Sequence, residues 1–529
     1  MKLASIIFLL TLQVYSSTGQ ITGILLNTEE ASEGYTLFFN SRFNSADVYL
    51  VDNCGEIINE WPNVADPELH PKILPNGNLV VLQDDEILQY DWDGSIAKRI
   101  QLNTSQNPRL KLVYETILMD NGNFLCIVRK SYSTSELRAM GLSFNGRNPS
   151  VLDGVVELDG ASGDVVWEWN IGDHMIQDRD ASVGNYGVVD DHPELVNIGD
   201  IGQVDWENYE SFMINGFAYN EELDQIALSV RKMSEVMIID HSTTTEEAAS
   251  HSGGTSGKGG DILFRFGDPA NYGRGSEEDR ILYFQHNPNW IKYGEHEGKI
   301  ICFNNGLSRP NTTFDTRYSE AIIFDPTVDA DGNFVQDADG EFLLDEDHIS
   351  YSGLEDDARF YSSYTSGAVV QPNGNIYITV GATSQMMELA PNGDKVWEYQ
   401  NPFRDYQYRS ERYPLDYEGF EGQVLLPQGP LSEANSNYEC ELTTSTGVLE
   451  LHQDLTLARI SNRLYSISSG DYTPIEYDLH DVNGTLVRQS TSRGISHELV
   501  LDELAAGMYF LVIRQQDQSS LVTKKIIIR

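Results

Sequence analysis

A two-part unit recurs along most of this sequence, and it constrains the fold more than any other feature. One part is an Asn-Gly turn between apolar runs, found at Leu74–Leu79, Met119–Phe124 and Gln371–Ile376. The other is a glycine turn followed by an alternating run that ends in an aromatic residue, found at Gly55–Trp61, Gly163–Trp169, Gly260–Phe266 and Gly393–Tyr399. Asn-Gly supplies the positive φ angles of a tight hairpin, and alternation at period two is typical of half-buried strands. The sequence therefore predicts a fold built from β-hairpins.

The spacing of this unit selects one β architecture. Copies recur about every 45 to 75 residues, which leaves room for four strands in each. Helical periodicity is nearly absent. We therefore expect an all-β chain with a six-bladed β-propeller over residues 20–403, a linker over residues 404–453 and a small C-terminal β-sandwich over residues 454–529.

Charge and the first residues indicate export. The 529 residues carry a formal net charge of −46, which disfavours nucleic acid and anionic membranes as partners. Such a surface suits an extracellular protein or, alternatively, a cationic substrate. Lys2 precedes an apolar run over Leu3–Val14, and small residues follow up to Gly19. This pattern predicts a signal peptide over residues 1–19 and no membrane span in the mature chain.

The four cysteines do not form a metal-binding or disulfide-scaffold pattern. Cys126 and Cys302 lie in strand-like runs, where buried free thiols are expected. Cys54 and Cys440 lie in less regular sequence, and a disulfide between them is an alternative to two free thiols.

Two insertions interrupt the repeat. Residues 251–260 are rich in glycine and contain Lys258, but a strand-like run follows where a phosphate-binding loop needs a helix. A flexible connector or a loop lining the central channel is the favoured interpretation. Residues 329–333 and 337–341 each contain Asp-Ala-Asp-Gly. A solvated hairpin with acidic turns is favoured there, and a Ca²⁺ site is the alternative because the spacing of an EF-hand is missing.

The C-terminal residues resemble a known export signal. The matching segments are Ile475–Gly484 with its Asp-Val-Asn-Gly turn, Leu499–Gly507, Met508–Arg514, and the basic end Lys524–Arg529. Together they are similar to the C-terminal sorting domain of the type IX secretion system. The resemblance implies export by that machinery in a Bacteroidetes-type bacterium, followed by removal of the tail. An ordinary binding sandwich is the alternative.

The repeat also locates equivalent positions on successive blades. In a propeller the innermost strands converge on the central axis, where function usually lies. Counting six residues back from each hairpin turn, or its equivalent, gives Leu69 with His70 beside it, Tyr114, Met213, His286 and Ser366. We expect these residues to face the axis.

Several segments around these positions resemble one enzyme family. They are Met213–Asn220, Asp224–Arg231, Ser234–Asp240, Gly260–Gly267, Phe284–Trp290 and Phe303–Gly306. In this order they are similar to the core of arylsulfotransferases that use no nucleotide sulfate donor. The resemblance implies a six-bladed propeller that moves a sulfuryl group from a phenol sulfate to another phenol through a sulfated histidine. It implies no metal and no cofactor.

Only some of the family's site residues have counterparts in this sequence. His286 matches the transiently sulfated histidine of the family, and Arg231 matches its sulfate-binding arginine. Met213 and Tyr114 stand where the family has histidines, so two of four expected catalytic positions differ. Methionine cannot act as an acid, whereas tyrosine can donate a hydrogen bond.

Two neighbours complete the expected site. His70 and Asn305 are substrate-binding candidates beside the four matched positions, and His70 or Tyr209 is a candidate to compensate for Met213. We expect a secreted arylsulfotransferase-like enzyme acting on a phenolic sulfate and a phenolic acceptor. The alternatives are a propeller that has lost catalysis and binds a ligand or protein at the cell surface, and a hydrolase that releases sulfate to water.

Overall fold

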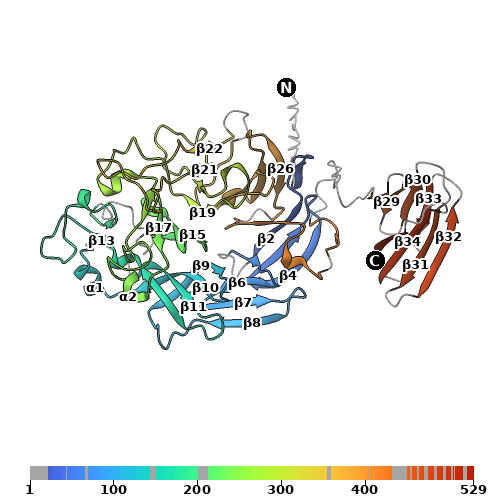
Figure 1. Cartoon of the computed structure of the whole chain (residues 1–529), viewed down its shortest axis with the longest axis horizontal. Helices are drawn as coiled ribbons and strands as arrows, with labels where there is room; N and C mark the ends of the chain where they lie inside the picture. Colours follow the sequence, from blue (N-terminus) through green and yellow to red (C-terminus); the bar gives the residue numbers. More distant parts are fainter. Residues whose placement is uncertain are drawn as a thin grey trace, which may run out of the picture. The chain divides into compact units, whose positions relative to one another are not determined.

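The strands expected from the repeat form antiparallel sheets in the computed structural model, which is almost entirely β-structure (Figure 1). The structure describes residues 22–528 with gaps at 43–44, 66–69, 143–150, 200–211, 354–358, 404–405, 424 and 432–448, and with shorter gaps within 453–520. The predicted signal peptide and Tyr209 lie outside the described residues. The chain divides into two compact units, Met1–Tyr438 and Glu439–Arg529. Within the described ranges, no helix is long and apolar enough to cross a membrane.

Sheets of four or five strands succeed one another along the first unit, and in most of them strands consecutive in the chain pair side by side. In the part of this unit that the structure describes there are six such sheets. The first sheet contains β27 (Glu411–Pro414), β2 (Gly34–Arg42), β3 (Ser45–Val51) and β4 (Ile57–Ala65). The second contains β5 (Lys72–Ile73), β6 (Leu79–Gln83), β7 (Glu86–Tyr90) and β8 (Ile96–Gln101). The third contains β9 (Leu110–Leu118), β10 (Phe124–Ser131), β11 (Val151–Leu158) and β12 (Val165–Asn170). The fourth sheet contains β15 (Ile214–Asn220), β16 (Gln225–Val230), β17 (Glu235–Asp240) and β18 (Phe264–Phe266). The fifth contains β19 (His286–Trp290), β20 (Ile300–Asn304), β21 (Glu320–Phe324) and β22 (Ile349–Tyr351). The sixth contains β23 (Gly367–Val370), β24 (Ile376–Val380), β25 (Gln385–Leu389), β26 (Lys395–Gln400) and β1 (Gly23–Asn27).

The two ends of the first unit join its first and last sheets. Strand β1 pairs with β26 in the last sheet, and β27 pairs with β2 in the first. In Figure 1 these blue and orange strands lie next to each other. β27 thereby takes the edge position that β5, β9, β15, β19 and β23 hold in the other sheets. The sequence predicts a linker over residues 404–453 because this stretch carries no repeat motif, but the backbone of residues 411–414 completes a sheet.

The Asn-Gly hairpins predicted from the repeat are confirmed. The three turns connect β5 to β6, β9 to β10, and β23 to β24, and each of these pairs is antiparallel. Gly77, Gly122 and Gly374 have φ angles of 87°, 84° and 86°. A side chain at these φ values would be strained, which explains the glycine in every copy of the turn.

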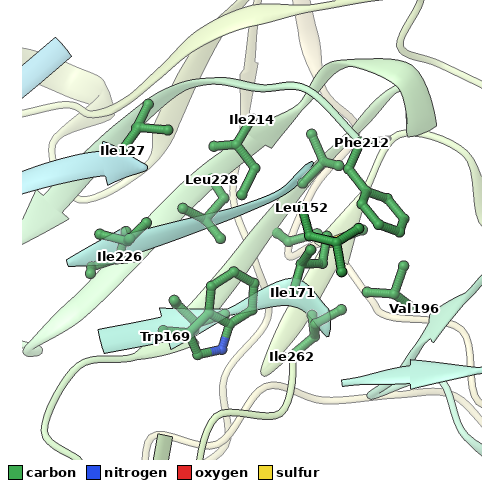
Figure 2. Packing of buried hydrophobic residues seen from close by; sticks show 14 of the residues in the cluster. Ile127, Leu152, Trp169, Ile171, Val196, Phe212, Ile214, Ile226, Leu228 and Ile262 are labelled. Carbon is green, nitrogen blue, oxygen red and sulfur yellow. The ribbon is translucent and has the colours of Figure 1, made fainter. Parts of the chain in front are cut away.

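Apolar side chains from neighbouring sheets form the core of the first unit. Figure 2 shows one cluster in which Leu152 and Trp169 of the third sheet lie with Ile214 and Leu228 of the fourth. All four side chains are almost completely excluded from solvent. Similar clusters join the other consecutive sheets, so many middle strands are buried on both faces rather than half-buried as the alternation predicts.

The tryptophans at strand ends also connect neighbouring sheets by hydrogen bonds. The ring N–H of Trp61 donates to the carbonyl oxygen of Asp91 at 3.0 Å, and that of Trp169 donates to Gly260 at 2.8 Å. Trp397, on the last sheet, donates to Asn53 on the first at 2.9 Å. A buried indole gains from such a partner because its N–H would otherwise lose its bond to water.

The second unit contains two four-stranded antiparallel sheets within its described residues. They are formed by β28 (Leu449–His452), β29 (Leu455–Ser461), β30 (Leu464–Ser469) and β33 (Ser496–Val500), and by β32 (Leu486–Ser492), β31 (Ile475–Asp481), β34 (Gly507–Gln515) and β35 (Leu521–Ile528). Leu479, Leu499 and Leu511 belong to one buried cluster that both sheets supply.

The cysteines divide as the sequence suggests. Cys126 and Cys302 are free and fully buried, and burial raises the pKa of the Cys126 thiol to about 12. Both thiols are therefore protonated and unreactive at neutral pH. Cys54 is disulfide-bonded. Cys440 lies outside the described residues.

The acidic insertion contains two hairpin-like turns. Asp329 accepts hydrogen bonds from the backbone N–H groups of Asp331 and Asn333, and Asp337 accepts in the same way from Asp339 and Glu341. These carboxylates are exposed and bonded to their own turns, which supports the interpretation as solvated acidic turns. Ca²⁺ binding at these turns stays a prediction.

Candidate functional site

Three of the positions selected by counting share an unusual backbone conformation, and another, Leu69, lies outside the described residues. Tyr114, Met213 and Ser366 have φ angles of 64°, 59° and 90°, in the left-handed region that side chains other than glycine rarely adopt. Beside them, the pairing registers of β9 with β10, β15 with β16, and β19 with β20 each shift at a bulge. β-bulges re-aim side chains and are common next to active sites. The edge strands β9, β15, β19 and β23 contact one another in chain order, so these irregularities gather in one region.

His286 is held at the start of β19 by two hydrogen bonds of its ring. Its Nδ1 lies 2.6 Å from Oδ1 of Asn305, and its Nε2 accepts the backbone N–H of Thr365 at 3.1 Å. Asn305 donates both of its N–H groups, to the carbonyl oxygens of Ser362 and Thr365 at 2.8 and 3.0 Å. Its oxygen therefore faces the ring as an acceptor, which assigns the proton of neutral His286 to Nδ1 and the lone pair to Nε2.

The surroundings keep this imidazole uncharged. Burial lowers the pKa of His286 well below its ordinary value, and the positive charges of Arg231 and Arg409 lower it further. The hydrogen bond with Asn305 acts in the opposite direction but is outweighed. A neutral imidazole with a defined lone pair is a nucleophile at neutral pH.

Arg231 lies directly after β16 and touches a second predicted site residue. Its Nη1 lies 3.6 Å from the sulfur of Met213, and its Nη2 donates to the carbonyl oxygen of Ser363 at 3.4 Å. The guanidinium also packs over the ring of Phe284, 4.9 Å from the ring centre. Because Phe284 is two residues before His286, this packing places a permanent positive charge beside the histidine.

A buried ionic network next to this group was not expected from the sequence. Glu115 is 1% exposed, and its Oε2 accepts from Arg409 at 2.5 Å and lies 3.1 Å from His70 Nδ1. Its Oε1 accepts the backbone N–H of Phe217 at 3.0 Å. Burial alone would raise the pKa of Glu115, but the charge of Arg409 and the contact with His70 outweigh it and lower that pKa. Glu115 is therefore ionised at neutral pH.

His70 lies between two carboxylates. Besides Glu115, it approaches Glu411 Oε1 with its Nε2 at 2.7 Å. The Nδ1 contact has hydrogen-bond geometry, whereas Nε2 makes no hydrogen bond. The structure thus gives His70 carboxylate neighbours, whereas the sequence predicts a substrate-binding role for it.

The side chain of Arg409 reaches this network by passing close to Gly216, which has no side chain. It precedes β27, donates to Glu115, and donates its Nη2 to the carbonyl oxygen of Asn215 at 2.9 Å. A Cβ at Gly216 would collide with that same Nη2 and would lie 3.2 Å from both Asn287 N and Glu115 Oε1. Gly216 thus allows Arg409 to cross the bulge of β15. Only the closure of the first sheet by β27 brings residue 409 here, and no local motif predicts it.

Tyr114 belongs to a stack on the other side of Glu115. Its ring stacks on Tyr408 with a centroid distance of 5.9 Å and an interplanar angle of 8°. Nη2 of Arg129 donates to its hydroxyl at 2.5 Å and lies over its ring. Arg129 also lies 3.7 Å from Asp153, whose other oxygen accepts the backbone N–H of Met213. Tyr114 and Met213 are therefore linked through one arginine and one aspartate.

The structure brings most of the predicted residues into connected contact sets. His286 contacts Asn305 directly, and Arg231 acts on it through charge and contacts Met213. The contacts of Asn305 orient His286, which differs from the substrate-binding role expected for it. Ser366 donates no bond to His286; its hydroxyl accepts the N–H of Gly381 at 2.9 Å and holds the adjoining loop.

Comparisons with solved structures find distant likeness. A β-propeller domain from Myceliophteria thermophila is 9% identical, with a TM-score of 0.35, covering 75% of this chain and 97% of that one. A catalytically inactive virginiamycin B lyase from Staphylococcus aureus, solved with quinupristin, is 10% identical with a TM-score of 0.29, covering 75% of this chain and 89% of that one. No curated protein matches this sequence.

Comparisons with families are more specific. Residues 461–529 match the secretion system C-terminal sorting domain, which indicates export to the cell surface or the medium and confirms the resemblance of the tail. Residues 24–409 match arylsulfotransferase (ASST), nearly the whole region from β1 to Arg409. This match covers most of the sequence and agrees with the order of its motifs: the chain belongs to the arylsulfotransferase family.

Proposed function

We propose that this protein transfers a sulfuryl group from a phenolic sulfate ester to a phenolic acceptor, with His286 as the nucleophile. The observation that carries the proposal is the state of His286: buried, neutral, with its proton held on Nδ1 by Asn305 and two arginine charges acting on it. A sulfate ester is an anion, so a neutral nucleophile beside fixed cations can approach its sulfur without charge repulsion.

The reaction has two steps. In the first, the Nε2 lone pair of His286 attacks sulfur, an N–S bond forms, and the S–O bond to the donor phenol breaks. The donor oxygen leaves with the electron pair and takes a proton. In the second, the acceptor phenol oxygen attacks sulfur, loses its proton, and the N–S bond breaks to restore the lone pair. The net change is one sulfate ester and one phenol exchanged for another of each.

Arg231 is the residue proposed to bind the sulfuryl oxygens. Its guanidinium stays charged and donates from a planar fork, which suits an oxyanion. Met213 takes the place of a family histidine and contacts the guanidinium through its sulfur. It therefore helps to position the guanidinium but supplies no proton. We assign protonation of the leaving phenolate to the hydroxyl of Tyr114, which accepts from Arg129 and carries a proton of its own.

The lone pair of His286 must be released before it can attack. It accepts the N–H of Thr365, and one lone pair cannot serve both partners. Thr365 and Ser366 have φ angles of 54° and 90°, a strained pair of residues in front of the histidine. We propose that substrate binding moves the Thr365 N–H from Nε2 to a sulfuryl oxygen.

The proposed architecture follows from the sheet order. The six sheets of the first unit are the blades of a six-bladed propeller closed by β1 and β27, and the two sheets of the second unit form a β-sandwich. The sorting domain then directs the chain, after cleavage of a signal peptide over residues 1–19, to the type IX machinery. The linker begins after β27 in this arrangement.

A transfer assay tests the function. The mature chain is mixed with a chromogenic phenol sulfate and a phenol acceptor, and His286→Ala is compared with His192→Ala. His192 is a half-exposed histidine beside Glu194, so it is a matched control. We expect the first change to lower transfer at least about a hundredfold, as loss of positioned active-site groups does, and the second to leave it unchanged. Trapping with donor alone should add one SO₃ group to the peptide that contains His286.

The second candidate function is ligand binding by a propeller that has lost catalysis, and Met213 favours it because methionine cannot act as an acid. A protein that only binds would show saturable binding of the sulfate ester without transfer, and no sulfated peptide. Release of sulfate without an acceptor at the same rate as with one would indicate the hydrolase. Transfer that survives in His286→Ala would contradict the proposed nucleophile.

A further inference from the structure

A second cluster of titratable side chains lies outside the site around His286. Among the residues that the structure describes, one group combines two histidines and an aspartate with ligand atoms within 4.8 Å of one another: His174, His251 and Asp261. Oδ1 of Asp261 lies 2.9 Å from Nδ1 of His174 and 2.7 Å from Nδ1 of His251. His174 is fully buried and Asp261 nearly so, whereas the His251 side chain is 63% exposed.

The hydrogen bond that His174 makes to the backbone leaves its Nδ1 available to a ligand. Its Nε2 lies 2.8 Å from the carbonyl oxygen of Ala248, and a carbonyl only accepts, so Nε2 carries the proton. Nδ1 is then the ring nitrogen that faces Asp261 Oδ1. A cation between these two atoms would bind both. Metal-bound histidines typically donate their other N–H to a backbone carbonyl, the arrangement found here.

We propose that His174 Nδ1, His251 Nδ1 and Asp261 Oδ1 bind one divalent transition-metal ion, with Zn²⁺ the best fit. Two imidazoles and one carboxylate are a ligand set that Zn²⁺ accepts, at bond lengths of about 2.0–2.2 Å. Such bonds in a tetrahedral site separate ligand atoms by about 3.3 Å, so the two aspartate–histidine separations would open by about half an ångström, and the two histidine nitrogens lie within 4.8 Å of each other. The exposed ring of His251 leaves the fourth position to water.

The position of the cluster gives the metal a structural role. His251 opens the glycine-rich insertion 251–260, and Asp261 follows it. His174 comes after β12 of the third sheet, and its ring stacks on Trp169 at an interplanar angle of 4°. A Cβ on Gly260 would collide with the His174 ring and with the Ala248 carbonyl, so this glycine allows the close approach. The metal would tie the insertion, which leads into the fourth sheet, to the end of the third.

Calorimetric titration tests the site directly. The mature chain, without a histidine tag, is titrated with ZnCl₂ alone, and His251→Ala is compared with the control His192→Ala. His251 is exposed, so its removal should leave the fold intact. We expect one ion per chain in the wild type, at least about a hundredfold weaker binding in His251→Ala because a direct ligand is lost, and no change in His192→Ala. Equal affinity in the wild type and His251→Ala overturns the site.

Proteolysis of the insertion gives a second readout that does not depend on affinity or on sulfuryl transfer. Lys258 is exposed in the middle of the insertion and is a trypsin site. Zn²⁺ should slow cleavage after Lys258 in the wild type but not in His251→Ala. Cleavage at the same rate with and without Zn²⁺ in the wild type would overturn the structural role.

Discussion

The buried carboxylate of Glu115 offers the sharpest test of how the center of the first unit is held together. Glu115→Gln keeps the shape of the side chain but removes its charge. The amide N–H₂ then faces Arg409 or His70, which are donors, and the cation of Arg409 remains buried without its carboxylate. Breaking a buried ion pair by removing one partner costs about 3–5 kcal/mol. We expect the free energy of unfolding of the first unit to fall by that amount.

Tryptophan fluorescence during urea unfolding is the appropriate assay. All seven tryptophans precede residue 439, so the signal reports the first unit alone. Glu346→Gln is the matched control: Glu346 pairs with Lys299, but its side chain is 55% exposed. An exposed pair contributes about 0–1 kcal/mol. If Glu115→Gln destabilised the protein no more than Glu346→Gln, the view of a charge-compensated center would be refuted.

The pH dependence of the same variant has a defined sign. The pKa of Glu115 is lowered in the folded protein, so the folded state binds its proton less readily than the unfolded state. Its contribution to stability is complete above the ordinary glutamate pKa of about 4.3 and is lost as the pH falls below it. The stability difference between the wild type and Glu115→Gln should therefore shrink below about pH 4. A difference that stays constant through that range would contradict the lowered pKa.

Three further predictions concern the site. Gly216→Ala should displace Arg409 and destabilise the first unit by about 1–3 kcal/mol, measured by the same urea titration; an unchanged midpoint would contradict the close approach. Met213→His should raise the rate of sulfuryl transfer, measured as kcat/KM, because it restores a proton donor next to Arg231; a rate equal to the wild type would show that Met213 does not limit catalysis. Because the pKa of His286 is lowered, the nucleophile stays neutral below pH 6.5, and kcat/KM should show no loss from its protonation between pH 7 and about pH 6. A decline of about threefold over that interval, which a histidine with the ordinary pKa of about 6.5 would give, would contradict the lowered pKa.

Much of the fold was predictable because it depends on local signals. The Asn-Gly turns specify hairpins through the φ angles of Gly77, Gly122 and Gly374, and the strand-end tryptophans mark buried positions between sheets. The closure of the first sheet was not predictable in the same way. β27 contains no turn motif, and its place is determined by pairing with β2, more than 370 positions away in sequence. Local patterns carry no information about such a partner.

The site was predictable only in part, for a related reason. His286 begins β19 and Arg231 directly follows β16, so both lie within the repeat and the family motifs identify them. Arg409 arrives with β27, and Glu115 has only its neighbour Tyr114 as a signal; their ion pair joins residues 294 positions apart. The role of Asn305 needs the positions of two carbonyl oxygens, which sequence does not contain.

The repeated backbone irregularity explains how substitutions at this site can be tolerated. Tyr114 and Met213 share a left-handed φ beside a bulge, although one side chain is aromatic and the other is a thioether. The backbone of Met213 is held by contacts that do not involve its side chain: its N–H donates to Asp153, and its carbonyl accepts the N–H of Arg231 at 3.0 Å. The backbone at this position therefore keeps its conformation whichever side chain it carries. A histidine at position 213 would stand on this backbone beside Arg231, so we expect Met213→His to change the chemistry of the site without dismantling it.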